Sequence, residues 1–166
     1  LSLIQPEWNL NNTQSAIIYS AYLGGYAISA LLVVPLTDRF KVSHIFIISS
    51  SISVLANATF PFLAYGVISA SVLRSVAGIG LAGVYMPGLK VISERFGSRA
   101  RGRAMGLFVS SFYAANSASL VATGLLMSWM DWRGAYFSLS LASGFSVPLA
   151  YLILRKFSAK KTNSSG

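Results

Sequence analysis

Cysteine is absent from the 166-residue chain, and histidine occurs once, at His44. Without cysteine there is no disulfide framework, no thiolate zinc site and no thiol nucleophile. One histidine cannot build a metal centre on its own. An enzyme would need a nucleophile with a base, or a cluster of metal ligands, near one face. The composition therefore argues against an enzyme, and we expect neither a cofactor nor a metal.

Charged residues are also scarce, at 10% of the chain, against about 25% in a soluble domain. Hydrophobic residues make up 54%, and the mean hydropathy is +0.63. A formal net charge of +9 is typical of nucleic-acid-binding domains, but those domains place their basic residues along a solvated face. Uncharged runs of about 20 residues leave no such face. The composition indicates a membrane protein whose partner is the lipid bilayer, and it argues against nucleic acid.

Five segments are long and apolar enough to cross a bilayer, which takes about 20 residues for a hydrocarbon core of roughly 30 Å. They predict an all-α membrane protein, a polytopic transmembrane helix bundle with spans at about 14–34, 45–65, 67–89, 104–127 and 135–154. The bundle, residues 14–154, should follow an outer loop, residues 1–13, and precede a cytoplasmic linker or tail, residues 155–166. Because the first residue is not methionine, we expect a fragment.

The basic residues predict how the bundle is oriented. If the spans alternate, eleven of the thirteen Lys and Arg residues lie on one side, in the first connection, in residues 90–103 and in the tail. The positive-inside rule places these segments in the cytoplasm. Trp8, Trp129 and Trp132 then fall at the outer interface, where tryptophan is enriched.

Four short motifs follow one another along the chain. LTDRFKVSHIF places Asp38 and Arg39 in a charged turn, and LRSVAGIG has an R-x-x-x-G-x-G pattern that contains Arg74. In ISERFGSRARGRAMGLF, Glu94 precedes an arginine-rich turn, and DWRGAYF opens the last span. Together they resemble the major facilitator superfamily (MFS) of secondary transporters. The resemblance covers essentially the whole chain, as helices two to six of an amino-terminal half.

The resemblance implies a gating role for Asp38, Arg39 and Glu94. In the family, the aspartate of the charged turn caps a helix of the other half in the outward-open state, and a basic residue of the turn pairs with an acid at the end of helix four. Both glycines and the two later arginines of the family's turn are missing here, so Arg39 or Lys41 would pair with Glu94. The alternative is that these charges only fix the orientation.

Arg74 is the first candidate for function. An ionisable residue inside a span costs about 2.5 to 3.5 kcal/mol to insert and usually faces a cavity or a partner. The predicted spans contain no acidic residue to neutralise it. The family's corresponding arginine is implicated in proton coupling or anion recognition. The alternative is that Arg74 extends to the membrane interface, as long cationic side chains do.

Polar side chains on two spans are candidates for a substrate or proton pathway with Arg74. Tyr22 and Tyr26 belong to a hydroxyl stripe on one helical face, and Tyr113 and Asn116 form a smaller polar patch. The stripe is equally typical of packed helices. The glycines of the Arg74 motif, Gly78 and Gly80, are interpreted as helix-packing positions, because small residues let helices approach in lipid.

These observations predict ion-gradient-coupled, proton-driven transport of a small solute by alternating access, with an anion favoured by Arg74. We expect a symporter in a bacterial inner (plasma) membrane, without nucleotide, because no phosphate-binding loop is present. Its expected further partners are a missing first helix and the carboxy-terminal half. The alternative is a transport-inactive MFS-like sensor or scaffold.

Overall fold

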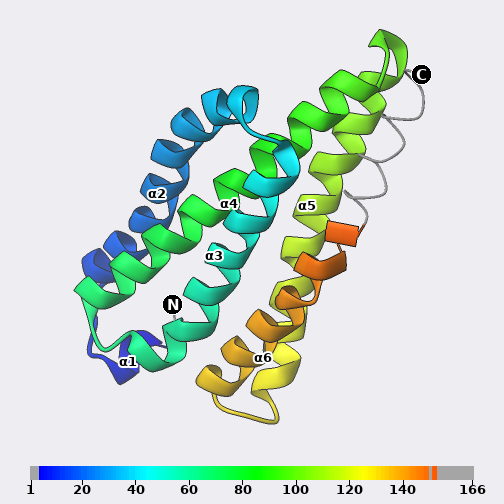
Figure 1. The fold of residues 1–166 in the computed structure, drawn as a ribbon. Helices are drawn as coiled ribbons and strands as arrows, with labels where there is room; N and C mark the ends of the chain where they lie inside the picture. The colour runs from blue at the N-terminus through cyan, green and yellow to red at the C-terminus, as the bar shows by residue number, and fades with distance from the viewer. Residues whose placement is uncertain (1–3, 150, 153–166) are drawn as a thin grey trace.

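The computed structural model describes residues 4–149 and 151–152, which form helices and no strands (Figure 1). The predicted all-α fold is confirmed. The described helices are α1 (Ile4–Glu7), α2 (Asn12–Arg39), α3 (Val42–Leu63), α4 (Val67–Arg95), α5 (Ser98–Met127) and α6 (Trp132–Gly144).

Four of these helices, α2 to α5, are long and apolar enough to cross a membrane. The fifth predicted span begins with α6, which has 13 residues, and helical residues resume at 146–149 after a turn at Phe145. Residues 150 and 153–154 of that span, and the predicted tail 155–166, lie outside the described residues.

α2, α4 and α5 are longer than the apolar runs that predicted them. α2 and α4 continue to Arg39 and Arg95, because backbone hydrogen bonding does not stop where hydropathy falls. α2 begins early because Asn11 caps it: the Asn11 side chain accepts from the Gln14 backbone at 2.8 Å, and Gln14 Oε1 accepts from the Asn11 backbone at 2.9 Å. The segment predicted as an outer loop thus contains α1 and this cap.

Small residues bring α4 against both α2 and α3. A side chain at Gly78 would clash with the Tyr22 carbonyl of α2, and a Cβ at Gly80 would lie 2.6 Å from Ser53 Cβ of α3. Hydroxyls also join the helices, since Ser75 Oγ donates to the Ala21 carbonyl at 3.0 Å. α2, α3 and α4 therefore form a closely packed group, as expected where lipid gives helices no hydrophobic reason to associate.

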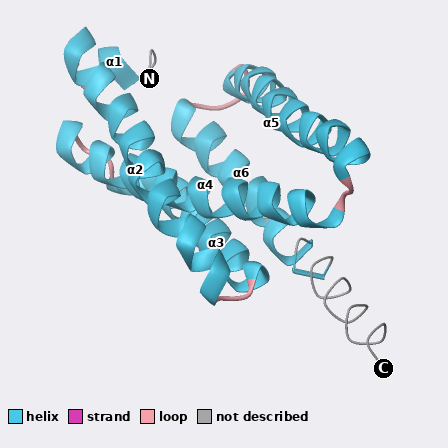
Figure 2. Ribbon diagram, turned by 90° about the horizontal axis from the view of Figure 1, so that it is seen from above, coloured by secondary structure: helices cyan, strands magenta, loops and turns pink. Residues whose placement is uncertain are grey.

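α5 is set apart from that group (Figure 2). It makes few contacts with α4 and α6, and none of its 30 residues is buried. Side chains added at Gly106 or Gly124 would meet nothing within 4 Å. An apolar face of α5 is thus uncovered within the described part of the chain.

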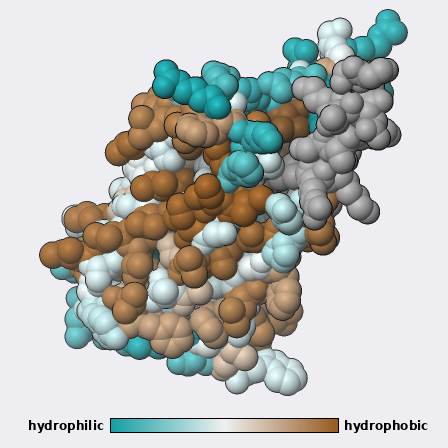
Figure 3. All heavy atoms as spheres, viewed as in Figure 1, coloured by the Kyte–Doolittle hydropathy of each residue, from teal (hydrophilic) through white to brown (hydrophobic). Residues whose placement is uncertain are grey.

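The two ends of the bundle differ in charge. The turns at residues 40–41 and 96–97 are both at the upper end in Figure 1, which we call the basic end because Arg39, Lys41 and Arg95 to Arg103 lie there. α1 and the turns at 64–66 and 128–131 lie at the other end, the α1 end. Hydrophobic residues cover the middle of the surface between them, and hydrophilic residues gather along its upper edge (Figure 3).

Candidate functional site

Arg74 lies on α4, in the half of the bundle nearer the α1 end, and aromatic rings of two other helices hold it. Its guanidinium carbon lies 4.6 Å from the ring centre of Phe60 on α3 and 5.2 Å from that of Tyr136 on α6. Phe60 is 1% exposed, and the two rings are 5.2 Å apart. Cation–π contacts of this kind stabilise a cation without neutralising it.

No acidic residue faces Arg74 in the part of the chain that the structure describes. Glu7 and Asp131 lie at the α1 end, and Asp38 and Glu94 at the basic end. Within the same ranges the guanidinium forms neither a hydrogen bond nor an ion pair, so its donors remain open to an anion. Tyr22 of α2 lies close enough to Arg74 for an electrostatic interaction between the two side chains.

We call the rings of Phe60 and Tyr136 the cradle of Arg74. Several polar side chains lie next to this cradle, between α3, α5 and α6. The Tyr136 hydroxyl donates to Asn57 Oδ1 at 2.8 Å, and Asn57 Nδ2 donates to the Ser53 carbonyl at 2.8 Å. They border a pocket of about 200 Å³ whose lining residues are mostly of polar types: Asn57, Ser119, Thr123, Tyr136, Leu139, Ser140 and Ser143. One face of Tyr136 thus contacts Arg74, while its hydroxyl reaches a polar pocket.

The other predicted pathway residues lie away from this cradle. The Tyr26 backbone runs beside Gly78 at the α2–α4 contact. Tyr113 and Asn116 are exposed on α5; the Tyr113 ring contacts Phe112, and the Asn116 carbonyl accepts from Ser119. No contact joins either residue to Arg74 among the described residues.

Phe60, Tyr136 and Asn57 were not among the predicted site residues. Tyr136 stands within the DWRGAYF motif, and Asn57 is an amide inside an apolar run, which needs a partner in lipid. These two signals were available in the sequence. Phe60 carried none, because a phenylalanine in an apolar segment is unremarkable without a structure.

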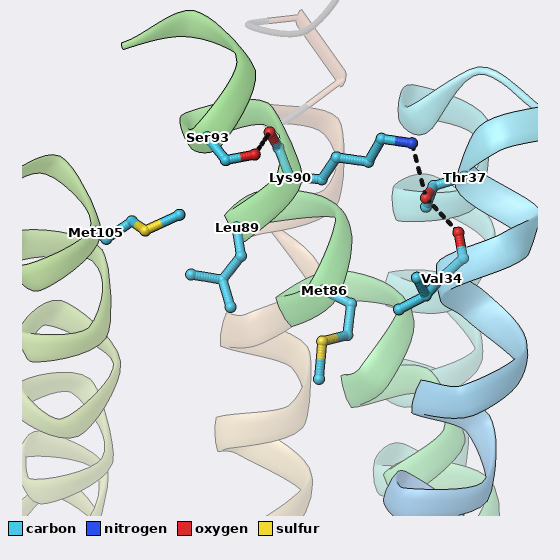
Figure 4. A pocket seen from close by; sticks show the side chains of 7 residues that line it. All are labelled: Val34, Thr37, Met86, Leu89, Lys90, Ser93 and Met105. Atoms are coloured by element: carbon cyan, nitrogen blue, oxygen red, sulfur yellow. Dashed lines mark hydrogen bonds between the residues drawn. The ribbon is translucent and has the colours of Figure 1, made fainter. Parts of the chain in front are cut away.

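At the basic end, Lys90 of α4 joins the acids that were predicted to gate. Its Nζ lies 2.5 Å from Asp38 Oδ1. The same nitrogen donates to Thr37 Oγ1 at 3.2 Å (Figure 4). Glu94 Oε1, one turn further along α4, is 4.0 Å away. Lys90 is thus placed between two carboxylates, one from each helix.

This arrangement differs from the expected pairing of Glu94 with Arg39 or Lys41. Arg39 and Lys41 form no ion pair within the described ranges, and Lys90 lies against both acids instead. The sequence contained a local signal for the contact of Lys90 with Glu94, because the two residues have i,i+4 spacing on a helix. The contact with Asp38 spans 52 residues, so only the packing of α2 against α4 brings it about.

A second pocket, of about 240 Å³, opens beside Lys90 between α2, α4 and α5. Its walls are mostly apolar, and the side chains that line it are Val34, Thr37, Met86, Leu89, Lys90, Ser93 and Met105 (Figure 4). Thr37 is buried, and its hydroxyl donates to the Val34 carbonyl at 2.7 Å, so one residue of α2 both contacts Lys90 and lines the pocket.

Comparison with known proteins finds similarity to membrane transporters. A 4-hydroxybenzoate transporter, PcaK, of Acinetobacter baylyi is 29% identical over 153 residues, which are 91% of this chain and 32% of the relative. An MFS transporter, cpaT, of Aspergillus oryzae is 26% identical over 144 residues, 87% of this chain and 29% of the relative. A probable efflux pump, mfs2, of Aspergillus flavus is 24% identical over 142 residues, 85% and 33% respectively.

The chain thus spans about a third of the length of the relatives it matches. Their names are those of transporters rather than enzymes. The model of the Major Facilitator Superfamily matches residues 1–166. With four helices able to cross a membrane, the chain is an integral membrane protein, and it belongs to the Major Facilitator Superfamily.

Proposed function

We propose that this chain forms part of a secondary transporter that carries a small organic anion across a membrane, driven by a proton gradient. The observation that carries the proposal is the environment of Arg74, an intramembrane cation with two aromatic rings against it and no acid. A charge in this setting usually serves function, because its insertion into lipid is costly. A carboxylate is the anion that suits Arg74 best, because a planar guanidinium can donate two parallel hydrogen bonds to the two carboxylate oxygens.

Tyr22, Tyr136 and Asn57 are the proposed polar neighbours of the bound anion. Tyr136 and Asn57 are hydrogen-bonded to each other, which fixes the tyrosine ring under Arg74. The bacterial relative is named for 4-hydroxybenzoate, an anion with one carboxylate and one phenol. Such a solute matches a site with one cation, ring faces and hydroxyls, so an aromatic acid is the first substrate class to test.

For alternating access we propose that the Asp38, Lys90 and Glu94 cluster is part of the gate at the basic end. Two carboxylates share one ammonium, so the cluster has one negative charge in excess that another cationic or hydrogen-bonding partner can take up. The Asp38 side chain is 71% exposed, so it is accessible to such a partner while it contacts Lys90. A charge contact that forms in one state and breaks in the other is a common bistable element of such transitions.

We further propose that two further parts of the transporter complete the site: a first membrane-spanning helix and a carboxy-terminal half. The uncovered face of α5 supports this, because an apolar helix in a transporter needs other helices at its glycines. The coverage of the relatives supports it too, since the aligned region is about a third of each. In this proposal the basic end faces the cytoplasm and the membrane is a plasma membrane; the relatives are fungal as well as bacterial.

Gradient-driven flux in proteoliposomes tests the proposal. The purified protein that contains this chain is reconstituted, and uptake of radiolabelled 4-hydroxybenzoate, benzoate and a short aliphatic dicarboxylate is followed with an acidic exterior. We expect accumulation of at least one anion that stops when a protonophore collapses the gradient. Anion binding without flux under any ion gradient would instead support the alternative, a transport-inactive sensor or scaffold.

The cluster at the basic end gives a kinetic prediction. Asp38→Asn should lower the turnover rate about fivefold and change KM by less than twofold, because it weakens a partly exposed ion pair worth about 1 kcal/mol. Asp131→Asn is the matched control: Asp131 caps α6 by accepting from the Gly134 backbone, and asparagine caps as well. Concentration series of uptake give both constants. Equal turnover in the two variants would leave Asp38 with a topological role alone.

A further inference from the structure

The segment before α2 folds over the α1 end of the bundle. Ile4 of α1 is 5% exposed and Leu10 is 9% exposed, and both lie in an apolar cluster. The other buried members come from three helices and the turn after α3; they are Ile18, Phe60, Ala64 and Ala70. Two apolar side chains of this segment thus cover the cluster at the α1 end.

The cluster beneath this segment includes the cradle of Arg74. Phe60 is one of its buried members, and Tyr136 packs against it. These are the two rings that contact the guanidinium. Residues 4–10 therefore pack on the same apolar cluster as the two rings that contact Arg74.

Polar contacts of Glu7 with Trp132 and Arg133, which we call the clasp, join the segment to the start of α6. Glu7 Oε1 accepts from Arg133 Nη2 at 2.9 Å, and Trp132 Nε1 donates to Glu7 Oε2. The Trp8 and Trp132 rings meet edge to face with centres 6.3 Å apart. No other ion pair at the α1 end joins two helices in the ranges that the structure describes.

We propose that residues 4–10 are a lid over the Arg74 site and that Glu7 and Arg133 are positioning residues that hold it closed. The inference rests on the proposed function in one respect, that Arg74 is where the solute binds. In the closed lid, Ile4 and Leu10 cover the apolar cluster. When the clasp opens, the segment pivots at the start of α2, where Asn9 has a positive φ of 48° and the Asn11 cap fixes the helix end.

The clasp is suited to opening. Glu7 and Arg133 side chains are 41% and 39% exposed, and ion pairs with this exposure are weak and screened by salt. The buried contacts of the lid are few, which places it among the low-stability parts of a fold, where ligand-gating segments belong. A weak clasp over a small apolar contact gives an equilibrium that a solute or a change of charge can shift.

The charge state of Glu7 adds a pH dependence. The hydrogen bond from Trp132 lowers the pKa of Glu7 below its ordinary 4.5, and the Arg133 guanidinium lowers it further; desolvation of the carboxyl and, more weakly, the charge of Asp131 oppose them. A carboxyl whose pKa is lowered in the closed form stabilises that form above its ordinary pKa, and the stabilisation is lost as pH falls through the lowered value. The lid is therefore expected to loosen in acid.

Thiol labelling tests the lid, because the chain has no cysteine. Ala64 is 0% exposed in the cluster under the lid, so Ala64→Cys is a reporter that leaves the lid residues unchanged. Its reaction with a maleimide is timed in detergent, where the reagent reaches both ends. We expect Glu7→Gln and Arg133→Gln each to speed labelling about fivefold, while Arg133→Lys, which keeps the pair, stays within twofold.

Equal labelling rates in all four backgrounds would overturn the lid. Thermal melting of each variant shows whether it folds, and two different disruptive variants guard against the failure of one. Lowering the pH through the lowered pKa of Glu7 should bring the ratio of Glu7→Gln to parent toward one, since the parent carboxyl is then protonated as well. Labelling needs no solute, so a lid that opens as expected while Arg74 proves irrelevant to flux would refute the proposed function alone.

Discussion

Arg74→Ala is expected to reduce anion uptake by at least about a hundredfold while the protein still inserts into the membrane. Removing one partner of a desolvated charge pair costs about 2 to 5 kcal/mol, and about 3 kcal/mol corresponds to more than a hundredfold. The guanidinium has no acidic partner in the described part of the chain, so its loss leaves no buried protein carboxylate unpaired. The effect should therefore fall on the solute rather than on folding.

Two further variants give this prediction its controls. Arg74→Lys keeps the charge but loses the planar fork, so uptake should fall between that of the parent and that of the alanine variant. Arg103 lies exposed near the start of α5, far along the chain from the ring cradle, and Arg103→Ala should stay within twofold of the parent. Wild-type uptake by Arg74→Ala in the same proteoliposomes would remove Arg74 from the mechanism.

The helices themselves were readable from the sequence because their signal is local. Runs of about 20 apolar residues demand a helix in lipid, wherever the rest of the chain lies. The same holds for Gly78 and Gly80, whose small size in a span indicates a packed face, and they do lie against α2 and α3. Helix ends were less accessible, since α2, α4 and α5 run on into polar turns that hydropathy does not mark.

The partners of the charged residues were not readable in the same way. Lys90 meets Asp38 only because α2 and α4 pack against each other, and Arg74 meets Phe60 and Tyr136 only because α3 packs against both α4 and α6. Such contacts depend on how each helix is rotated about its axis, which a span prediction leaves open. The clasp joins Glu7 to Arg133, which are 126 residues apart in sequence, and Glu7 belongs to the segment that was predicted as an outer loop.

The orientation of the bundle decides what each end can do. With the basic end in the cytoplasm, the lid of residues 4–10 faces the exterior and the Lys90 cluster faces the interior. Solute from outside would then meet the lid first and reach Arg74 below it. With the opposite orientation, the acid-sensitive clasp would face the cytoplasm, and an acidic exterior would have no access to it.

Ser98 and Ser128 mark the two ends of α5 and make a matched pair for measuring this orientation. Ser98 begins the helix in the arginine-rich turn, and Ser128 follows its last residue at the α1 end. Both are exposed, so either accepts cysteine with little change in packing. A helix of 30 residues is about 45 Å long, which is enough to reach from one headgroup region to the other.

Labelling of these two cysteines by a membrane-impermeant maleimide on intact cells is the most direct test that the bundle crosses the bilayer with its arginine-rich turn inside. We expect Ser128→Cys to be labelled at least about tenfold faster than Ser98→Cys, and the two to label equally once the membrane is permeabilised. Fast labelling of Ser98→Cys on intact cells, with Ser128→Cys protected, would contradict the orientation on which the lid and the gate depend.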